Sequence, residues 1–355
     1  MKARFLLLKS KVLENYYKVK GIADIVSYSF KTNTEVGKIL ESETDSYFTV
    51  ESLKSLRMLK RESSKRIFYY LQAASFDDLE EIFSIGVENF IVDNKFDLDT
   101  LLCFSKLKSV KINLFLRVKI KEKTMHTGKH FVFGMSAEQM NSIIPNLRKN
   151  ENINSLGIHF HRKTQNVAEW SLINDVEEVL SKETLESVDF INIGGGLPSR
   201  YKNYELKHLE SIFNRINEFR EWANSRGIKL IIEPGRFIAA SAVKLECEII
   251  AIYENNIIVN CSVFNAAMDT FVLNLRLLVE GELEENQFNK GQFEERNAIP
   301  YVIKGCTNDS MDIFRYKVYL PEKKVGDKIV FLNAGAYNYA TDFCGLEKLE
   351  TRTVD

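Results

Sequence analysis

Apolar residues recur along the first two thirds of the chain in eight short runs rich in β-branched and aromatic residues. Between the runs lie amphipathic stretches, such as TEVGKIL (34–40) and SFDDLEEIFSIG (75–86), whose apolar residues have helical spacing. Strands that alternate with helix-length crossovers pair in parallel, and eight such units close a (β/α)8 TIM-type barrel. The number of strands alone leaves an open α/β sheet as the alternative. The predicted strands are DIVSYSF (24–30), DSYFTV (45–50), RIFYYL (66–71), NFIVD (89–93), INLFLRV (112–118), SLGIHFH (155–161), DFINIGG (189–195) and KLIIEPG (229–235).

After about residue 240 the pattern changes to strand-like runs separated by turn signals. These runs are KLECEIIAIYENNIIVNCSV (244–263), NAIPYVIKG (297–305), FRYKVYLP (314–321) and KIVFLNAGAYNYA (328–340). They predict an all-β second domain. The first twenty or so residues look helical and precede the first barrel strand, so we expect them to pack against that domain. The predicted domains are a barrel over 22–238 and a β-rich domain over 239–355 that residues 1–21 complete.

The composition is that of an ordinary globular protein, with 45% hydrophobic and 27% charged residues. The 48 basic and 49 acidic residues nearly cancel, so no strong field favours nucleic acid or an anionic membrane. The five cysteines are scattered and lack CxxC spacing, which predicts a reducing compartment and no metal site. The apolar stretch in MKARFLLLKSK (1–11) is too short for a signal peptide or a membrane span, so we expect a cytoplasmic protein.

Chemically functional residues recur where the predicted strands end, which is where barrels of this kind carry their active sites. The first run is followed by Lys31, the sixth ends at His161, the seventh runs into Gly194 to Gly196, and the eighth carries Glu233 ahead of Arg236. Taken singly, each has an ordinary explanation: a solvated lysine, an exposed histidine, a tight turn or a surface ion pair. Their shared position at one end of a barrel makes these explanations insufficient.

The side chains and glycines at these strand ends are suited to bind a phosphate, a pyridine ring and an aldehyde. Glycines allow backbone N–H groups to approach an anion closely, and Arg236 adds charge-assisted hydrogen bonds to phosphate. A carboxylate at Glu233 can keep a ring nitrogen protonated, and Lys31 can form a Schiff base with an aldehyde. His161 offers a flat face to stack on a ring. Together these groups predict pyridoxal 5'-phosphate as cofactor.

Six motifs in order resemble the ornithine/diaminopimelate/arginine decarboxylase family. Its members bind pyridoxal phosphate in an alanine-racemase-like barrel that is followed by a C-terminal β domain. The motifs are YSFKTN (28–33), GIHFHRKTQ (157–165), INIGGGLP (191–198), IEPGRFIAASA (232–242), GCTNDSMD (305–312) and NAGAYNYA (333–340). The resemblance covers nearly the whole chain, and several ordered motifs are far more specific than any one of them.

The resemblance implies a role for each matching residue. Lys31 would carry the cofactor as a Schiff base, His161 would stack on its ring, and Glu233 would pair with the pyridine nitrogen. The implied cofactor-binding residues are Lys31, Asp45, Arg117, His161, Thr164, Gly194, Gly195, Gly196, Glu233, Gly235, Arg236 and Tyr337.

Three of these matches are less direct. Thr164 stands where the family has a serine that touches the phosphate, and it keeps the hydroxyl group. Asp45 falls where an acid lies near the lysine and the ring hydroxyl, and Arg117 matches an arginine behind the cofactor. The resemblance also implies a head-to-tail homodimer in which the GCTNDSMD segment reaches into the partner's active site.

That segment departs from the family pattern. Asn308 occupies the position of a catalytic cysteine, and Asp309 follows as expected for a catalytic and substrate-binding acid. Cys306, two residues earlier, and Cys344, in DFCG, are candidate substitutes that would contact the substrate. The alternative is that both are ordinary small residues and that Lys31 or water delivers the proton.

A second departure concerns the substrate. Cys261, in VNCSV, stands where ornithine decarboxylases have an aspartate that binds the distal amine of the substrate. Loss of that carboxylate removes a charge-assisted hydrogen bond worth about 1.5–3 kcal/mol. Free ornithine or lysine should then bind poorly, unless Asp269 or Asp312 compensates. The following SVFNAAMD resembles the carboxynorspermidine decarboxylase branch, whose substrates carry a substituted distal nitrogen.

A third departure places Val132 where the family's KFG motif has a lysine, and nearby His126, Lys129 and His130 add positive charge that suits an acidic substituent. We therefore expect a decarboxylase for a conjugated diamino acid, such as an acylated or citrylated ornithine from a siderophore or polyamine route. An amino-acid racemase shares the barrel and the lysine and is the first alternative. Racemases of this fold set an arginine against the ring nitrogen, so Glu233 favours decarboxylation. A non-catalytic regulator is the second alternative.

Overall fold

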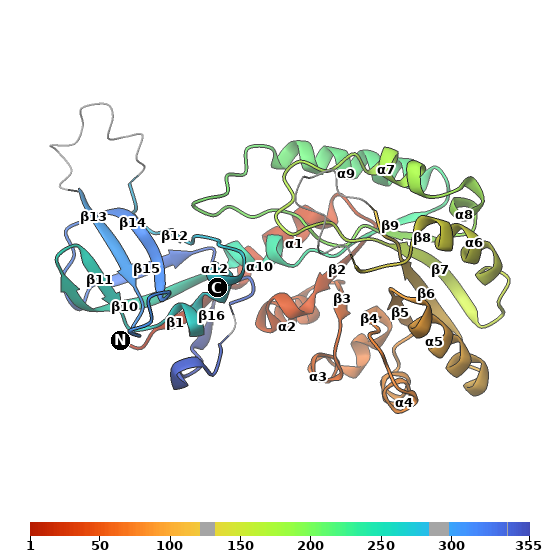
Figure 1. Cartoon of the computed structure of the whole chain (residues 1–355), viewed down its shortest axis with the longest axis horizontal. Coiled ribbons are helices and arrows are strands. Elements are labelled where there is room, and N and C mark those ends of the chain that lie inside the picture. The colour runs from red at the N-terminus through yellow and green to blue at the C-terminus, as the bar shows by residue number, and fades with distance from the viewer. Residues whose placement is uncertain (121–131, 284–297, 339) are drawn as a thin grey trace. The chain divides into compact units, whose positions relative to one another are not determined.

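The computed structural model describes residues 1–120, 132–283, 298–338 and 340–355. Contacts divide the chain into two units, shown in Figure 1. The barrel unit comprises Asn15–Pro198 and Lys207–Gly235, and the sheet unit comprises Met1–Glu14, Ser199–Leu206 and Arg236–Asp355.

The barrel unit confirms the eight predicted strands, which pair in parallel and close a barrel in chain order. Several strands end two or three residues earlier than predicted. The strands are β2 (Ile25–Ser29), β3 (Tyr47–Val50), β4 (Ile67–Tyr70), β5 (Asn89–Val92), β6 (Ile112–Arg117), β7 (Ile153–His159), β8 (Phe190–Asn192) and β9 (Lys229–Ile232).

Helices connect these strands and lie outside them (Figure 1). Their ends follow local sequence signals, as α4 illustrates: Ser75 and Asp78 form a capping box, and Gly86 ends the helix at φ 101°. α1 (Lys9–Lys20) precedes the first barrel strand, and its residues up to Glu14 belong to the sheet unit. The other helical segments are η1 (Phe30–Thr32), α2 (Thr34–Glu43), α3 (Leu53–Leu56), η2 (Arg61–Arg66), α4 (Phe76–Ile85), α5 (Lys95–Lys108), α6 (Ala137–Leu147), α7 (Leu172–Val179), α8 (Lys182–Glu186) and α9 (Leu209–Asn224).

The interior of the barrel is a packed core and not a channel. Phe68, Ile91, Phe115 and Ile231, from four different strands, form one buried cluster. The Phe68 and Phe115 rings meet edge to face with centroids 5.1 Å apart. A Cβ at Gly157 would lie 2.4 Å from the Phe115 ring, so glycine is required there. Each such buried side chain stabilises the fold by about 1.5–3 kcal/mol, and chemistry is left to the strand ends.

The sheet unit confirms the predicted β-rich region. It contains an eight-stranded sheet with the path β12-β15-β10-β11-β13-β14, and β1 joins it by pairing with β10 and β16. The strands are β1 (Arg4–Leu8), β10 (Val243–Tyr253), β11 (Asn256–Val259), β12 (Leu278–Val279), β13 (Ala298–Lys304), β14 (Ile313–Pro321), β15 (Lys328–Leu332) and β16 (Glu350–Val354). The helical segments are α10 (Arg236–Ala239), η4 (Ala240–Ala242), α11 (Val263–Ala266), α12 (Met268–Val272) and η6 (Phe343–Gly345).

The helical interpretation of the first twenty residues was wrong for its first part. Arg4–Leu8 is a strand, antiparallel to β10 and parallel to β16, and the helix α1 begins only at Lys9. Side chains along β1 alternate between buried and half-buried, as a strand requires. Pairing on both sides decides the conformation here, and those partners lie more than two hundred residues away in the sequence.

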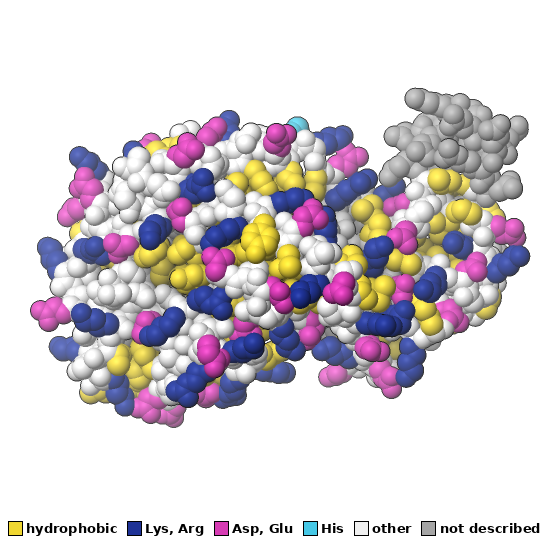
Figure 2. Space-filling model, turned by 180° about the vertical axis from the view of Figure 1, so that it is seen from behind, with side chains coloured by type: hydrophobic (Ala, Val, Ile, Leu, Met, Phe, Trp, Pro, Cys, Tyr) yellow, Lys and Arg dark blue, Asp and Glu magenta, His cyan; other side chains and the backbone are white. Residues whose placement is uncertain are grey.

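Lys and Arg side chains are interspersed with Asp and Glu side chains over the face seen in Figure 2. This mixed surface agrees with the near-zero net charge of the chain. None of the helices in the described ranges is long and apolar enough to cross a membrane.

Candidate active site

Lys31 lies on the short η1 turn between β2 and α2, not on the strand itself. Its neighbours Phe30 and Thr32 are buried, whereas the Lys31 side chain is 53% exposed. Asn33 caps α2 by accepting hydrogen bonds from two backbone N–H groups of the first helical turn. The turn is therefore fixed on both sides of the lysine, and the amine is presented at the strand ends.

Glu233 follows β9 and is almost fully buried, with 8% exposure. Its Oε1 accepts hydrogen bonds from Thr49 Oγ1 at 2.8 Å and from Asn192 Nδ2 at 2.9 Å, and its Oε2 lies 3.3 Å from His159 Nε2. Burial alone would raise the pKa of Glu233, but His159, Asn192 and Thr49 outweigh it and hold the pKa at about 2. The carboxyl group is therefore an anion at neutral pH.

His159, the last residue of β7, connects Glu233 to a second group of side chains. Its ring meets Tyr70 edge to face at 5.6 Å, and the Tyr70 hydroxyl accepts a hydrogen bond from Arg117 Nη1 at 2.9 Å. The buried His159 Nδ1 has no hydrogen-bond partner among the described residues. An unmet acceptor costs less than an unmet N–H donor, which favours the tautomer that donates from Nε2 to Glu233.

His161 packs against the glycine loop that follows β8. The Gly195 N–H donates to His161 Nδ1 at 3.1 Å, so the ring proton of the neutral imidazole sits on Nε2. Solvent reaches the His161 side chain, although protein atoms crowd around it. This burial among protein atoms, followed by the nearby His159 and Arg117, lowers the pKa of His161 below its usual range and keeps the ring neutral.

The three consecutive glycines are required by space and by backbone conformation. Gly194 and Gly196 have φ angles of 64° and 103°, which favour glycine. A Cβ at Gly195 would lie 2.7 Å from the Glu233 carbonyl oxygen. The loop after β7, which carries Thr164, contacts this loop because the Asn166 N–H donates to the Gly196 carbonyl at 2.9 Å.

In the sheet unit, Arg236 is buried at the start of α10. Its Nη1 donates to Tyr201 Oη at 3.0 Å and forms an ion pair with Asp269, and the guanidinium lies 5.0 Å from the centre of the Tyr337 ring. Tyr337 has a φ of 55°, an uncommon value for a residue with a side chain. Gly235 lies in the barrel unit, where a Cβ would collide with the Thr32 hydroxyl.

The groups at the strand ends fit pyridoxal phosphate in their chemistry. The barrel unit supplies a lysine amine, an ionised carboxylate, a neutral histidine ring and a glycine loop too crowded for side chains. These are the groups that an aldehyde, a pyridine nitrogen, a ring face and a phosphate need.

Comparison with known proteins agrees with this chemistry. Residues 22–240 match the family described as pyridoxal-dependent decarboxylase, pyridoxal binding domain. The chain belongs to the pyridoxal-dependent decarboxylase family. Pyridoxal phosphate is accordingly its cofactor.

Known relatives in this decarboxylase family are distant. The chain is 25% identical to carboxynorspermidine/carboxyspermidine decarboxylase of Campylobacter jejuni over 84% of its length and 77% of the relative's. It is 24% identical to antizyme inhibitor 2 of Xenopus laevis, with coverages of 90% and 74%. It spans only 52% and 65% of two diaminopimelate decarboxylases that it also matches. The crystal structure of diaminopimelate decarboxylase from Helicobacter pylori shares its fold, with a TM-score of 0.84 at 18% identity over 100% of this chain and 92% of that one.

The structure does not bring Asp45 of this decarboxylase-family chain to the site. Asp45 precedes β3, at the opposite end of the strand from Thr49, where it accepts hydrogen bonds from Tyr16 at 2.6 Å and Lys20 at 2.7 Å. These two groups lower the pKa of Asp45, Lys20 contributing most. Thr49, near the far end of the strand, is the β3 residue that reaches Glu233.

Several residues at the site were missed in the sequence, although the rule that found the others applies to them. Tyr70, His159 and Asn192 are the last residues of their strands, and Thr49 is the last but one. The predicted ends of β7 and β8 fell two and three residues too late, which drew attention to His161 and the glycines. A correct boundary would have indicated the missed residues.

The loop between β13 and β14 carries Asn308, which is exposed, and Asp309, which is half-buried. The buried Asp312 holds this loop, since its carboxylate accepts from Val263 N–H at 2.9 Å and from the N–H and hydroxyl of Thr307 at 3.0 and 2.7 Å. Asp312 and Asp269, the two acids considered as substitutes for the missing aspartate, are therefore already engaged within the sheet unit.

Cys261 is buried, with an exposure of 1%. It lies beside Cys247, whose thiol, together with burial, raises the pKa of Cys261 well above its usual range. Cys306 and Cys344 are exposed free thiols. Val132 is exposed as well, whereas His126, Lys129 and His130 lie outside the described residues.

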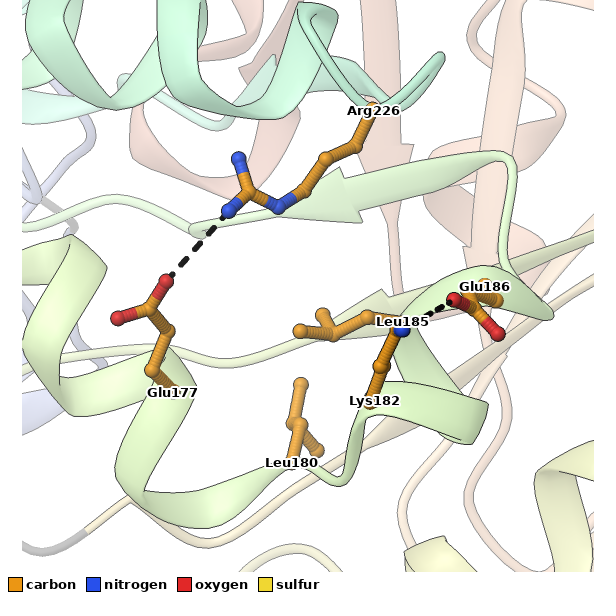
Figure 3. Close-up of a pocket in the computed structure, with 6 residues that line it drawn as sticks. All are labelled: Glu177, Leu180, Lys182, Leu185, Glu186 and Arg226. Atoms are coloured by element: carbon orange, nitrogen blue, oxygen red, sulfur yellow. Dashed lines mark ion pairs between the residues drawn. The ribbon is translucent and has the colours of Figure 1, made fainter.

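A surface hollow of about 420 Å³ lies on the helices outside the barrel and is separate from the strand ends (Figure 3). Its charges are already paired, with 3.6 Å between Arg226 and Glu177 and 3.6 Å between Lys182 and Glu186. Leu180 and Leu185 lie between these pairs (Figure 3). This lining gives the hollow no reactive group of its own.

Proposed function

We propose that this protein is a pyridoxal-phosphate-dependent decarboxylase that removes the α-carboxylate of a diamino acid. The observation that carries the proposal is a buried, ionised Glu233 on the same barrel mouth as Lys31. A carboxylate there keeps a pyridine nitrogen protonated, which decarboxylation requires more than racemisation does. When bound, pyridoxal phosphate supplies the electron sink for loss of carbon dioxide.

The residues of the chain have separate tasks in this proposal. Lys31 Nζ would hold the cofactor through its aldehyde group. Glu233 is ionised and would hold a proton at the ring nitrogen, and His161 would cover a ring face as a neutral imidazole. The glycine loop would bind the phosphate through its backbone N–H groups, and the sequence resemblance assigns Arg236 and Tyr337 to the same group.

We propose a substrate whose distal amine is substituted, such as a conjugated ornithine from a siderophore or polyamine route. Cys261 is buried, and Asp269 and Asp312 are engaged by other groups. None of the three offers a carboxylate to a free distal ammonium, and this supports a less cationic substrate. The similarity to carboxynorspermidine/carboxyspermidine decarboxylase is in line with such a substrate.

The proposed enzyme is cytoplasmic and acts as a homodimer, in which the loop around Asn308 and Asp309 completes the partner's active site. The support is the exposed position of Asn308 on a surface loop and the sequence resemblance of that loop. In a dimer, Cys306 or Cys344 could then deliver the proton that replaces carbon dioxide.

The test is the mass of the product after cofactor-loaded protein has been incubated with free and distally conjugated diamino acids. We expect loss of carbon dioxide from a conjugate, with free ornithine and lysine unchanged. Efficient turnover of free ornithine would refute the substrate proposal, and unchanged mass with inverted α-carbons would replace the decarboxylase by a racemase. The Lys31→Ala variant should lose the absorbance of the lysine-bound cofactor.

The similarity to antizyme inhibitor 2 favours a second candidate function, a regulatory protein without catalysis. Such a protein has no physical need of Lys31 or of an ionised Glu233. Absence of cofactor absorbance in the wild-type protein after loading would therefore select the regulator.

A further inference from the structure

Glu51 lies beside Lys31 at the mouth of the barrel. β2 and β3 are parallel neighbours with Ser29 opposite Thr49. Lys31 and Glu51 each come two residues after this pair, so they lie next to each other just beyond the ends of the two strands. Lys31 Nζ is 3.4 Å from Glu51 Oε1. None of the motifs in the sequence indicated Glu51.

The charged and titratable groups around Glu51 come from three other strands. Lys31 follows β2, Tyr69 lies in β4 and Glu233 follows β9. Burial raises the pKa of Glu51 above its usual range; Lys31 opposes this shift and Glu233 adds to it. Although the Glu51 side chain is 35% exposed, its carboxyl group therefore binds a proton more readily than a fully solvated glutamate does.

We infer that Glu51 is the proton partner of Lys31. Its carboxylate stabilises the ammonium form of Lys31 while the lysine is not bonded to the cofactor, and it accepts one proton when the lysine has to act as a neutral amine. In that transfer one N–H bond at Nζ breaks and one O–H bond at Oε1 forms, and no other bond changes. The inference rests on the proposed function, because exchange of the cofactor between lysine and substrate requires Lys31 to change its protonation in every turnover.

The test measures acetylation of Lys31 by acetic anhydride in the full-length protein after removal of the cofactor, followed by mass spectrometry of the peptide. Glu51→Gln removes the charge and keeps the size of the side chain. Because the Lys31 side chain is 53% exposed, solvent screens the pair. We expect acetylation at neutral pH to accelerate about fivefold, near the upper end of what an exposed ion pair provides.

Two further variants separate the proton role from a loss of structure. Glu51→Asp keeps the charge and should fall between wild type and Glu51→Gln. Glu35→Gln removes a carboxylate that lies 2.9 Å from Lys38 on α2, so it should accelerate acetylation of Lys38 and leave Lys31 unchanged. Tryptophan fluorescence verifies that each variant is folded.

Equal acetylation of Lys31 in wild type and in folded Glu51→Gln would overturn the inference. The same result would leave the decarboxylase proposal intact, because that proposal is tested by product mass. Conversely, faster acetylation in Glu51→Gln together with no decarboxylation in the wild type would preserve the pair and refute the reaction. A second measurement uses the protein loaded with cofactor. There, Glu51→Gln should move the pH at which the absorbance of the lysine-bound cofactor changes.

Discussion

Asn192→Asp is the most direct test of the buried anion at Glu233. Asn192 is fully buried, donates from Nδ2 to Glu233 Oε1 at 2.9 Å and accepts at Oδ1 from the Gly194 N–H at 2.9 Å. The substitution keeps the shape and the bond to Gly194. It replaces the donor that faces Glu233 by a second carboxylate oxygen.

The magnitude follows from the closeness of the two carboxylates. Two like charges about 4 Å apart at an effective dielectric constant of about 20 repel by about 4 kcal/mol. Binding a proton to one carboxyl group relieves the repulsion, but near pH 7 this costs about 1.4 kcal/mol for each pH unit above the ordinary pKa, again roughly 4 kcal/mol. Either way, the free energy of unfolding should fall by about 3–4 kcal/mol at neutral pH.

The sign of the pH dependence is also fixed. In the variant the folded state binds a proton that the unfolded state releases, so stability recovers by about 1.4 kcal/mol per unit as the pH falls toward 5. In the wild type the pKa of Glu233 is depressed to about 2. Its contribution is therefore fully present above its unfolded pKa and is lost only as the pH falls through that low value, which leaves it constant over the range of the experiment.

Urea unfolding followed by tryptophan fluorescence measures this loss in the barrel unit, because both tryptophans, Trp170 and Trp222, lie there. Asn217→Asp is the matched control. Asn217 also donates to a glutamate, Glu221, at 2.9 Å, but at an exposed position on α9, where like charges cost about 0.5 kcal/mol or less. If Asn192→Asp costs no more than this control, or if its cost does not shrink as the pH falls, Glu233 is not held as a buried anion.

Two further substitutions test the loops around the site. Asp312→Ala leaves the backbone N–H groups of Val263 and Thr307 without their acceptor. We therefore expect the free energy of unfolding, measured by urea unfolding with circular dichroism, to fall by about 2–4 kcal/mol. An unchanged midpoint would mean that another group holds the loop. Gly195→Ala places a Cβ 2.7 Å from a backbone carbonyl oxygen, so it should lower the free energy of unfolding by about 1–3 kcal/mol and weaken cofactor binding. In the control Gly21→Ala the closest neighbour of the Cβ is at 3.5 Å, so stability should be nearly unchanged. Equal unfolding midpoints for the two variants would refute the steric argument.

Hydrophobic patterning predicted the barrel because each strand is a short apolar run with helices on either side in the sequence. The same patterning could not indicate that Arg4–Leu8 is a strand or that Ser199–Leu206 belongs with the sheet unit. Both assignments depend on distant partners, such as the hydrogen bond from Lys202 N to Arg276 O at 2.8 Å. A single sequence contains no local signal for such pairing.

The sequence indicated those residues of the candidate site whose side chains are charged and reactive, such as Lys31 and Glu233. It was mistaken at Asp45, because an acid near a strand was taken for an acid at the strand's catalytic end. Thr49 was overlooked because a threonine in a strand is ordinary until a buried carboxylate is found 2.8 Å from it. The role of Thr49 depends on its neighbour Glu233, which only the closed barrel brings next to it.

β3 and the residue after it supply a partner to each of the two side chains, Glu233 and Lys31, on which the proposed chemistry depends. Thr49, the last but one residue of β3, donates to Glu233, and Glu51, which follows the end of the strand, pairs with Lys31. A hydrogen bond of 2.8 Å between the Ser27 and Thr49 hydroxyls, both buried in the barrel, links β2 to β3 and helps to set their register. A shift of β3 by one residue would turn the Thr49 side chain to the other face and displace Glu51, which follows it. The register of one short strand therefore determines which side chains meet Glu233 and Lys31.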